Sequence, residues 1–241
     1  MNFFKFKGIT MTSKTKLTLI YFKMRALAEP PQLLLNYANI PYEYKMSWEY
    51  FDKPWDLVKP DVPFGQLPLL VTKNGNQIAQ SGSIIRYIAG IANMIPPDHD
   101  IAAKADSIFE TAHEMFFPLN PTINFATGSA FEEAKISILS NVQSRLENFE
   151  RLLSASPEGP YFLGKELHYC DFGAFHHLSL LRYLDKNVFI SYPNIQEFMG
   201  SIENINSIAE YLRKRPDLIG VGSRPQLIIN GQKCNTGVNK D

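Results

Sequence analysis

Residues 64–91 read FGQLPLLVTKNGNQIAQSGSIIRYIAGI, and this stretch decides the fold. Its apolar run at residues 67–71 predicts a buried strand, and Asn74-Gly75-Asn76 predicts a hairpin turn into a short return strand at residues 77–79. Ser81 then predicts the N-cap of a helix. The core face of that helix is formed by four isoleucines at helical spacing, Ile84, Ile85, Ile88 and Ile91.

The residues before this stretch predict a strand, a helix and a second strand. Residues 17–22 form a compact β-rich run, and residues 41–46 alternate as a strand does. Between them, residues 25–38 have apolar side chains at helical spacing, with Pro30 and Pro31 near the start, where proline is tolerated best. The order β-α-β followed by β-β-α predicts a small mixed sheet with helices packed on it.

The pattern changes after residue 95, where Pro96-Pro97-Asp98 is typical of a linker. Every later pattern is helical, which predicts an α/β domain over residues 15–95 and an all-helical domain over residues 97–220. The expected helices cover roughly residues 100–126, 131–155, 171–182, 193–203 and 205–213. We expect residues 1–14 to be a flexible extension and the polar, Gly- and Asn-rich residues 221–241 to be an irregular tail.

Composition excludes several classes of protein. The 241 residues contain 24 basic and 24 acidic side chains, so the charge gives no reason to expect nucleic acid or an anionic membrane as a partner. No apolar run reaches the ~18 residues of a membrane span. The two cysteines form neither a disulfide framework nor a metal-ligand pattern. We therefore expect a cytoplasmic protein that binds no metal.

Short motifs follow one another in a fixed order along the first domain. They are Tyr21-Phe22-Lys23-Met24-Arg25 with Ala28-Glu29, then Trp55 with Lys59, then Phe64-Gly65-Gln66-Leu67-Pro68, then Gln80-Ser81 with Ile84, Arg86 and Tyr87. Together they resemble the thioredoxin-like domain of the cytosolic glutathione transferases, and within them the Tyr-dependent, sigma-like classes. The resemblance covers residues 16–215, densely in the first domain and mostly as a pattern in the second.

The resemblance implies a thioredoxin-like domain joined to an all-helical domain, in a homodimeric, detoxifying enzyme. Such an enzyme takes glutathione as co-substrate and conjugates it to a small hydrophobic electrophile. An alternative is a non-catalytic protein of the same fold, either a crystallin-like structural protein or a carrier of hydrophobic ligands, because fold does not fix function.

Tyr21 is the expected catalytic residue. A hydroxyl that donates to sulfur stabilises the thiolate, which is the nucleophile, and so lowers the pKa of the thiol. Arg25 lies near it in sequence and would add positive potential beside the sulfur or Tyr21; a structural salt bridge at the first helix is the other interpretation of this arginine. We also expect Phe22 to contact glutathione.

The resemblance assigns the remaining glutathione contacts. The Leu67-Pro68 bond is cis in the family, so that the Leu67 backbone can pair with the cysteinyl part of glutathione. Gln80 and Ser81 at a helix N-terminus, with Gln66, would hold the γ-glutamyl end. Trp55 and Lys59 would bind the glycyl carboxylate. Each has a simpler interpretation: a trans proline at an edge strand, a plain N-cap, a packing tryptophan and a solvated lysine.

Three further expectations concern the second domain. By alignment, Glu114 would reach the γ-glutamyl amine of glutathione in the partner subunit. The second-substrate pocket would contain Phe22, Met24, Phe116 and Phe117, although the two phenylalanines could equally belong to the core. The acids Asp106, Glu110 and Glu114 recur every four residues, and basic groups or the ammonium of glutathione in the partner subunit would relieve their repulsion. The alternative is a solvated acidic face on a monomer.

The sequence departs from the family pattern at two places. Ala26 stands where the family usually has glycine, which should do little harm because alanine is a good helix former. The usual Ser/Thr-x-x-Asp capping box reads His168-Tyr169-Cys170-Asp171, so the hydroxyl cap is missing and stability is affected rather than chemistry. We interpret His176-His177 as structural.

Overall fold

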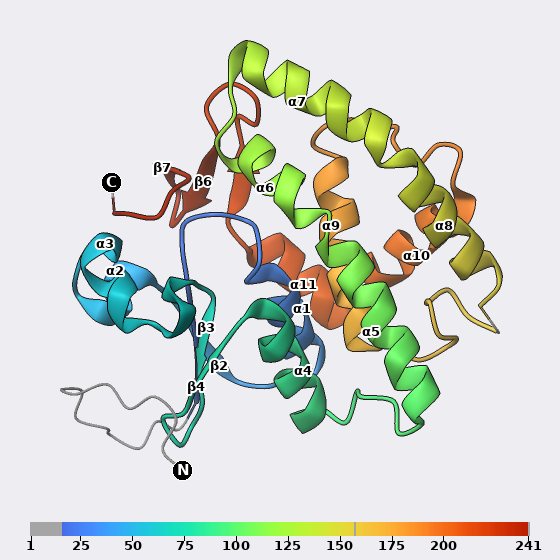
Figure 1. Cartoon of the computed structure of the whole chain (residues 1–241), viewed down its shortest axis with the longest axis horizontal. Coiled ribbons are helices and arrows are strands. Elements are labelled where there is room, and N and C mark those ends of the chain that lie inside the picture. Colours follow the sequence, from blue (N-terminus) through green and yellow to red (C-terminus); the bar gives the residue numbers. More distant parts are fainter. Residues whose placement is uncertain (1–15, 157, 241) are drawn as a thin grey trace.

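A four-stranded mixed sheet forms the centre of the first domain in the computed structural model, which describes residues 16–156 and 158–240 (Figure 1). The strands lie in the order β2-β1-β3-β4, with β1 parallel to β2 and antiparallel to β3. Their bounds are β1 Leu17–Tyr21, β2 Tyr42–Met46, β3 Leu69–Val71 and β4 Gln77–Ala79. The expected hairpin between β3 and β4 is confirmed: the strands pair antiparallel, and Gly75 takes the positive φ that the turn requires.

Helices α1 (Glu29–Tyr37) and α4 (Ser81–Ile91) contact each other, and α1 also contacts the second domain through α9 and α11. Helix α1 begins four residues later than Arg25, the first residue of the predicted helix. The residues before Glu29 form a loop that passes over the end of β1. Short helices α2 (Ser47–Phe51) and α3 (Trp55–Val58) and two 3₁₀ turns, η1 (Lys59–Asp61) and η2 (Pro63–Gly65), connect β2 to β3.

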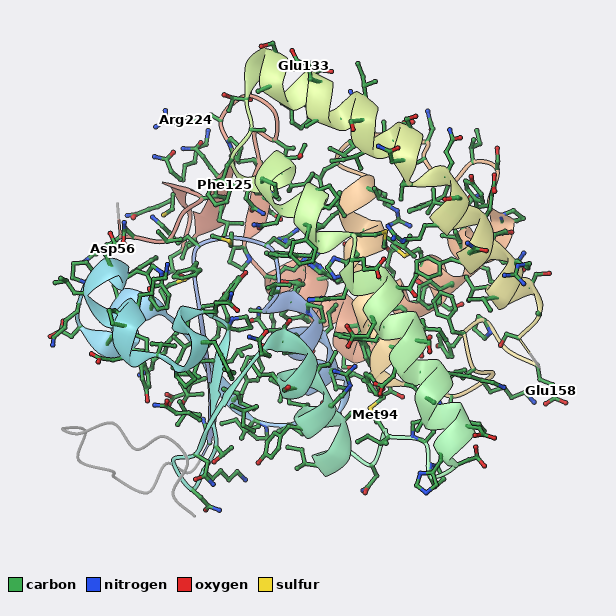
Figure 2. The ribbon with its side chains drawn as sticks, in the orientation of Figure 1. Asp56, Met94, Phe125, Glu133, Glu158 and Arg224 are labelled. Carbon is green, nitrogen blue, oxygen red and sulfur yellow. The ribbon has the colours of Figure 1, made fainter. Side chains whose placement is uncertain are left out.

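The second domain is a helical bundle built around α9 (Tyr169–Leu181), whose residues are all buried except Ser179. Helix α5 packs along α9, and the side chains drawn in Figure 2 fill the space between these helices and the first domain. The other helices are α5 His99–His113, α6 Phe116–Asn124, α7 Gly128–Asn141, α8 Gln143–Ser154, α10 Pro193–Glu203 and α11 Asn206–Lys214. The expected combination of a thioredoxin-like domain and a helical domain is therefore confirmed.

Two predicted helices are each divided in two. The predicted helix at residues 100–126 breaks between α5 and α6, because Pro118 has no N–H to donate to the Glu114 carbonyl. The predicted helix at residues 131–155 starts earlier, at Gly128, and is interrupted at Val142. Within the described residues, no helix is long and apolar enough to span a membrane.

The expectation of an irregular tail at residues 221–241 is wrong. Strands β5 (Asp217–Ile219), β6 (Gln226–Ile229) and β7 (Gln232–Asn235) form an antiparallel sheet, and β5 falls within the segment expected to be helical. The reason is a turn at Asn230-Gly231, where both residues have positive φ, as a type I′ hairpin turn requires. Buried Leu218 and Leu227 anchor the sheet. The predicted extension at residues 1–14 lies outside the described residues.

Candidate active site

Tyr21 ends β1 beneath the loop that leads to α1, and it is 2% exposed. Its phenolic oxygen accepts the backbone N–H of Leu27 over 3.3 Å. Burial raises the pKa of Tyr21 well above its usual range, and the Leu27 N–H opposes that rise only in part. The phenol therefore keeps its proton at neutral pH and can donate it to an anion that is placed beside it.

Phe22 packs between Tyr21 and Trp55. The ring centroids of Tyr21 and Phe22 lie 5.4 Å apart, and those of Phe22 and Trp55 lie 5.1 Å apart at an interplanar angle of 80°. Trp55 is buried at the start of α3, whereas Lys59 is exposed where η1 begins. The aromatic cluster fixes α3 against the end of β1, and Lys59 lies at its solvent-exposed margin.

The residues expected at the peptide end of glutathione come from two loops that meet. The Gln80 side-chain amide donates to the Gln66 side-chain carbonyl over 3.1 Å. Directly after Gln66, the Leu67-Pro68 peptide bond is cis. Strand pairing begins two residues after Leu67, at Leu69. The structure thus brings Gln66, Leu67, Pro68 and Gln80 to one end of β3.

Ser81 is not the N-cap of α4. Gln80 holds the cap position, with φ 70° and ψ 121°, and makes no side-chain cap hydrogen bond. Ser81 is the first helical residue and is buried. The expectation that Ser81 caps the helix is corrected by one residue, because the unusual backbone of Gln80 turns the chain into the helix. The free N–H groups at this helix end are a suitable site for a carboxylate.

Arg25 does not approach the Tyr21 hydroxyl through any hydrogen bond found in the structure. Its guanidinium, 6% exposed, donates to the Tyr183 hydroxyl over 2.9 Å and to the Pro216 carbonyl. The buried salt bridge at the first helix joins Glu29 to Arg215 instead. Arg25 therefore links the loop after β1 to the helical domain, and its effect on the sulfur stays a prediction.

The residues expected in the second-substrate pocket lie on different elements. Phe116 and Phe117 begin α6 with ring centroids 5.7 Å apart, and the half-buried Phe116 stacks on the His113 ring. Phe117 is 71% exposed, so the interpretation of Phe117 as a core residue is wrong. Met24 is buried in the loop after β1, where it lines a cavity together with Arg25 of the same loop.

The acidic stripe of α5 has its basic partners within the same chain. Arg86 on α4 lies 2.7 Å from Asp106 and 2.6 Å from Glu110, and Arg145 on α8 lies 2.7 Å from Glu114. Repulsion along this stripe therefore gives no argument for a partner subunit. The exposed Glu114 would have to leave Arg145 to reach a ligand elsewhere.

His176 and His177 are buried in α9, and within the described part of the chain neither ring nitrogen has a hydrogen-bond partner. Burial lowers the pKa of both rings far below the usual value, so both are neutral. Among the residues that the structure describes, no cluster of three His, Cys, Asp or Glu side chains could hold a metal ion.

Sequence reasoning did not identify Leu27, whose contribution is a backbone N–H and therefore leaves no trace in residue type. It also did not identify Asn124, whose side-chain amide donates to the Arg25 carbonyl over 3.4 Å. Thr236 in turn donates to the Asn124 carbonyl. These contacts hold the loop after β1 from the side of α6.

Comparison with known proteins agrees with this geometry. The description "Glutathione S-transferase, N-terminal domain" matches residues 17–90, and "Glutathione S-transferase, C-terminal domain" matches residues 114–215. Glutathione S-transferase 4 of Caenorhabditis elegans is 31% identical over 209 residues, which cover 83% of this chain and 97% of that protein. Glutathione S-transferase Mu 4 of Homo sapiens is 26% identical over 204 residues, 82% of this chain and 90% of that protein. The solved Pi-class glutathione S-transferase of Onchocerca volvulus matches with a TM-score of 0.74 and 27% identity, over 83% of this chain and 93% of that one.

Proposed function

The chain belongs to the glutathione S-transferase family, and we propose that it is a working transferase in which Tyr21 activates the glutathione thiol. The observation that carries the proposal is the environment of the Tyr21 hydroxyl. It is buried, held by the Leu27 N–H and protonated at neutral pH. A phenol in this state can donate a hydrogen bond to the glutathione thiolate. Because it already holds its own proton, it cannot act as the base that removes the proton from the thiol.

The proposed reaction needs little from the protein beyond this donor. The thiol proton leaves to solvent, and the Tyr21 hydroxyl stabilises the thiolate that remains. The sulfur forms a bond to the electrophilic carbon of R–X, and X leaves with the electron pair of the broken C–X bond. A free thiol has a pKa of ~8.5, so a charge-assisted hydrogen bond increases the fraction of thiolate present near neutral pH.

Binding of the rest of glutathione is assigned to the groups around the end of β3. The Leu67 backbone would pair with the cysteinyl part, and the N-terminus of α4 with Gln66, Gln80 and Ser81 would hold the γ-glutamyl end. Trp55 and Lys59 would bind the glycyl carboxylate. The hydrogen bond between Gln66 and Gln80 supports this assignment, because it holds two polar side chains together at the same end of β3.

The finer classification is also a proposal. We place the chain in a sigma-like class on its motifs, and we propose a cytosolic homodimer that conjugates hydrophobic electrophiles beside Phe22, Phe116 and Phe117. Dimerisation would cover apolar surface that the single chain leaves open, including Phe64, which is 73% exposed.

The competing function is a non-catalytic protein on the same scaffold. A glutathione-affinity column and a chlorodinitrobenzene conjugation assay separate the two. Retention on the column with turnover supports the transferase. Failure to bind glutathione, or binding without conjugation of any of several electrophiles, would favour the structural protein or carrier.

A further inference from the structure

The C-terminal extension, residues 216–240, begins where the match to the family's C-terminal domain ends, at residue 215. Its three strands form a sheet of their own, and Figure 1 shows β6 and β7 beside α6. The extension nevertheless contacts the first domain, because it returns to the loop after β1. This loop, residues 22–28, carries the chain from Tyr21 to α1 and contains neither helix nor strand.

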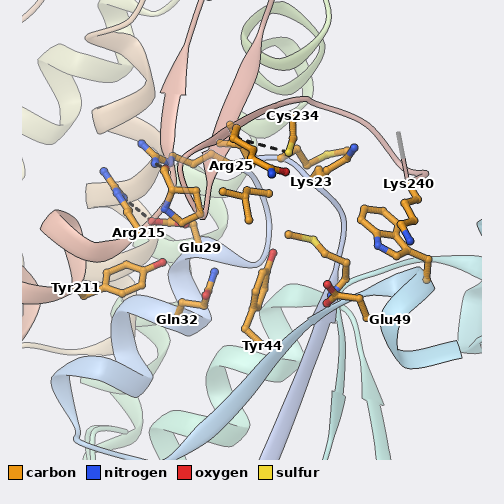
Figure 3. Close-up of a pocket in the computed structure, with 17 residues that line it drawn as sticks. Lys23, Arg25, Glu29, Gln32, Tyr44, Glu49, Tyr211, Arg215, Cys234 and Lys240 are labelled. Carbon is orange, nitrogen blue, oxygen red and sulfur yellow. Dashed lines mark hydrogen bonds and ion pairs between the residues drawn. The ribbon is translucent and has the colours of Figure 1, made fainter. Parts of the chain in front are cut away.

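The extension pairs directly with the backbone of this loop. The Lys23 N–H donates to the Gly237 carbonyl over 3.1 Å, and the Gly237 N–H donates to the Lys23 carbonyl over 3.0 Å. Figure 3 shows Lys23 and Arg25 of the loop close to Cys234 of the extension. Pairing of β1 with its neighbouring strands ends at Tyr21, so the extension supplies the backbone partners two residues beyond the end of the sheet.

Arg25 in the same loop is linked to both ends of the extension. Its guanidinium donates to the carbonyl of Pro216, the first residue of the extension. Its own carbonyl accepts the side-chain amide of Asn124 over 3.4 Å, and the Thr236 hydroxyl donates to the Asn124 carbonyl. Asn124 is 1% exposed, so these hydrogen bonds lie in the interior, where a hydrogen bond is stronger than in water.

These contacts surround the backbone that presents the Leu27 N–H to Tyr21. Lys23 and Arg25 lie between these two residues in the chain, and Leu27 follows Arg25 by two residues. An irregular loop has no helix or strand bonds to fix its backbone, so its conformation depends on partners outside it. A shift of the extension would therefore move the N–H that orients the Tyr21 hydroxyl.

We propose that the extension is a positioning strap: it holds the loop after β1 so that the Leu27 N–H directs the Tyr21 hydroxyl at the glutathione sulfur. This role presupposes the proposed function, in which Tyr21 stabilises the thiolate, and therefore rests on it. It adds Thr236 and Gly237, which lie outside the matched domains, to the residues that determine turnover. Both act through the loop, and a catalytic group displaced by about 1 Å can lose most of its effect.

The test compares two substitutions at one residue. Gly237→Pro removes the N–H that bonds to the Lys23 carbonyl, whereas the conservative Gly237→Ala keeps it. Apart from its chain neighbours, a Cβ at residue 237 meets no atom of the described residues within 4 Å, so alanine fits.

In Gly237→Pro, kcat at saturating glutathione should fall about three- to tenfold, and the thiolate fraction of bound glutathione near neutral pH should fall with it. Gly237→Ala should match the wild type, and glutathione affinity should stay within about twofold in both variants. Lower stability alone would leave the thiolate fraction in the folded protein unchanged.

Hydrogen exchange of the Leu27 amide reports on the strap without glutathione. Exchange should be about tenfold or more faster in Gly237→Pro than in Gly237→Ala, because the loop opens locally once its partner is lost. The amides of the buried helix α9 should exchange at equal rates in the two variants, since only global unfolding exposes them. This comparison separates a loosened loop from a generally destabilised protein.

A second pair of variants serves if Gly237→Pro does not fold. Thr236→Val removes the hydroxyl that donates to the Asn124 carbonyl and keeps the size of the side chain. Ser223→Ala is its control, because the Ser223 hydroxyl donates to the Gly220 carbonyl within the extension. Thr236→Val should show the same losses as those expected of Gly237→Pro, and Ser223→Ala should show none.

Where the wild type lowers the thiol pKa, three results would each overturn the strap. They are an unchanged thiolate fraction in Gly237→Pro, equal losses in Gly237→Pro and Gly237→Ala, and unchanged exchange at Leu27. A wild type that does not lower the thiol pKa overturns the role of Tyr21 instead, and with it the catalytic effect of the strap. Exchange at Leu27 then shows whether the extension holds the loop.

Discussion

The backbone N–H of Leu27 donates to the phenolic oxygen of Tyr21 over 3.3 Å, so the loop before α1 sets the orientation of the proposed catalytic hydroxyl. Because the oxygen accepts this bond, its own proton remains available for a second partner. Burial keeps that proton in place, since it raises the pKa of Tyr21. Leu27 lies in the loop two residues before α1 begins at Glu29, so this contact ties Tyr21 to the loop and not to the helix.

Tyr21→Phe should lower kcat about 10- to 100-fold, because a hydrogen bond to a charged group contributes ~1.5–3 kcal/mol. Glutathione affinity should change little, since phenylalanine removes only the donor to sulfur. The pKa of the bound thiol should rise, which is measured as a loss of thiolate absorbance near neutral pH. Unchanged turnover would contradict the assignment of Tyr21.

Gln80→Ala should weaken glutathione binding more than it slows the reaction at saturating glutathione. Gln80 lies beside Gln66, where we place the γ-glutamyl end of glutathione, away from the sulfur. Such contacts stabilise the bound substrate and the transition state equally. Ser81→Ala should behave in the same way. Calorimetry and steady-state kinetics measure the two effects, with the exposed Gln143→Ala as control. A fall in kcat without a change in affinity would place these residues in the chemistry instead.

Arg25→Lys should destabilise the fold by ~1–3 kcal/mol, because lysine cannot keep both hydrogen bonds of the buried guanidinium. Those bonds go to Tyr183 and to the Pro216 carbonyl. A double-mutant cycle with Tyr183→Phe, followed by urea unfolding, should give a coupling energy above ~0.5 kcal/mol. A fully stable Arg25→Lys protein with little activity would instead support a direct electrostatic role at the sulfur.

Asp171 predicts a pH-dependent stability. Its carboxylate accepts the N–H groups of His168 at 2.8 Å and Phe162 at 3.2 Å, while burial raises its pKa to about 7. The unfolded value is ~3.9, so the folded state binds the proton more tightly. The stabilisation is complete below pH ~4 and is lost as pH rises through about 7.

Urea unfolding at pH 5 and pH 8 tests this expectation against Asp171→Asn, which cannot titrate. Between these pH values the wild type should lose on the order of 2 kcal/mol relative to the variant. The His168 side chain takes no part in this pH dependence through the helix cap. It forms no cap hydrogen bond, and its Nδ1 lies 3.3 Å from the Met94 carbonyl. A parallel pH dependence in both proteins would show that Asp171 stays ionised in the fold.

The parts of the fold that could be predicted are those that local pattern determines. The strand, turn and helix of residues 67–91 depend on side chains a few residues apart. The hairpin at Asn230-Gly231 carries an equally local signal, an Asn-Gly pair between short apolar and polar runs, but the polar composition of the whole segment predicts an irregular tail and outweighs that signal.

The partners of the site residues could not be predicted in the same way. Arg25 is 158 residues from Tyr183 and 191 from the Pro216 carbonyl, and no local pattern connects them. Glu114, at the end of α5, is likewise 31 residues from its partner Arg145 on α8, and only the tertiary structure brings the two together. Motif order could therefore nominate the residues of the site, whereas their hydrogen bonds and ion pairs required the structure.

The last prediction concerns assembly. Sedimentation at micromolar concentration should give about twice the chain mass of 27.4 kDa. We expect Phe64 in the interface, because it is a large apolar side chain left 73% exposed in the single chain, and a partner subunit would cover it. Burying one such ring stabilises by ~1.5–3 kcal/mol, and a symmetric dimer buries it twice, so Phe64→Ser should raise the dimer Kd by at least about 100-fold. Ile190→Ser removes an equally exposed apolar side chain on the second domain and should leave the dimer intact. A wild-type monomer with full activity would refute both the dimer and any contact of Glu114 with glutathione across the interface.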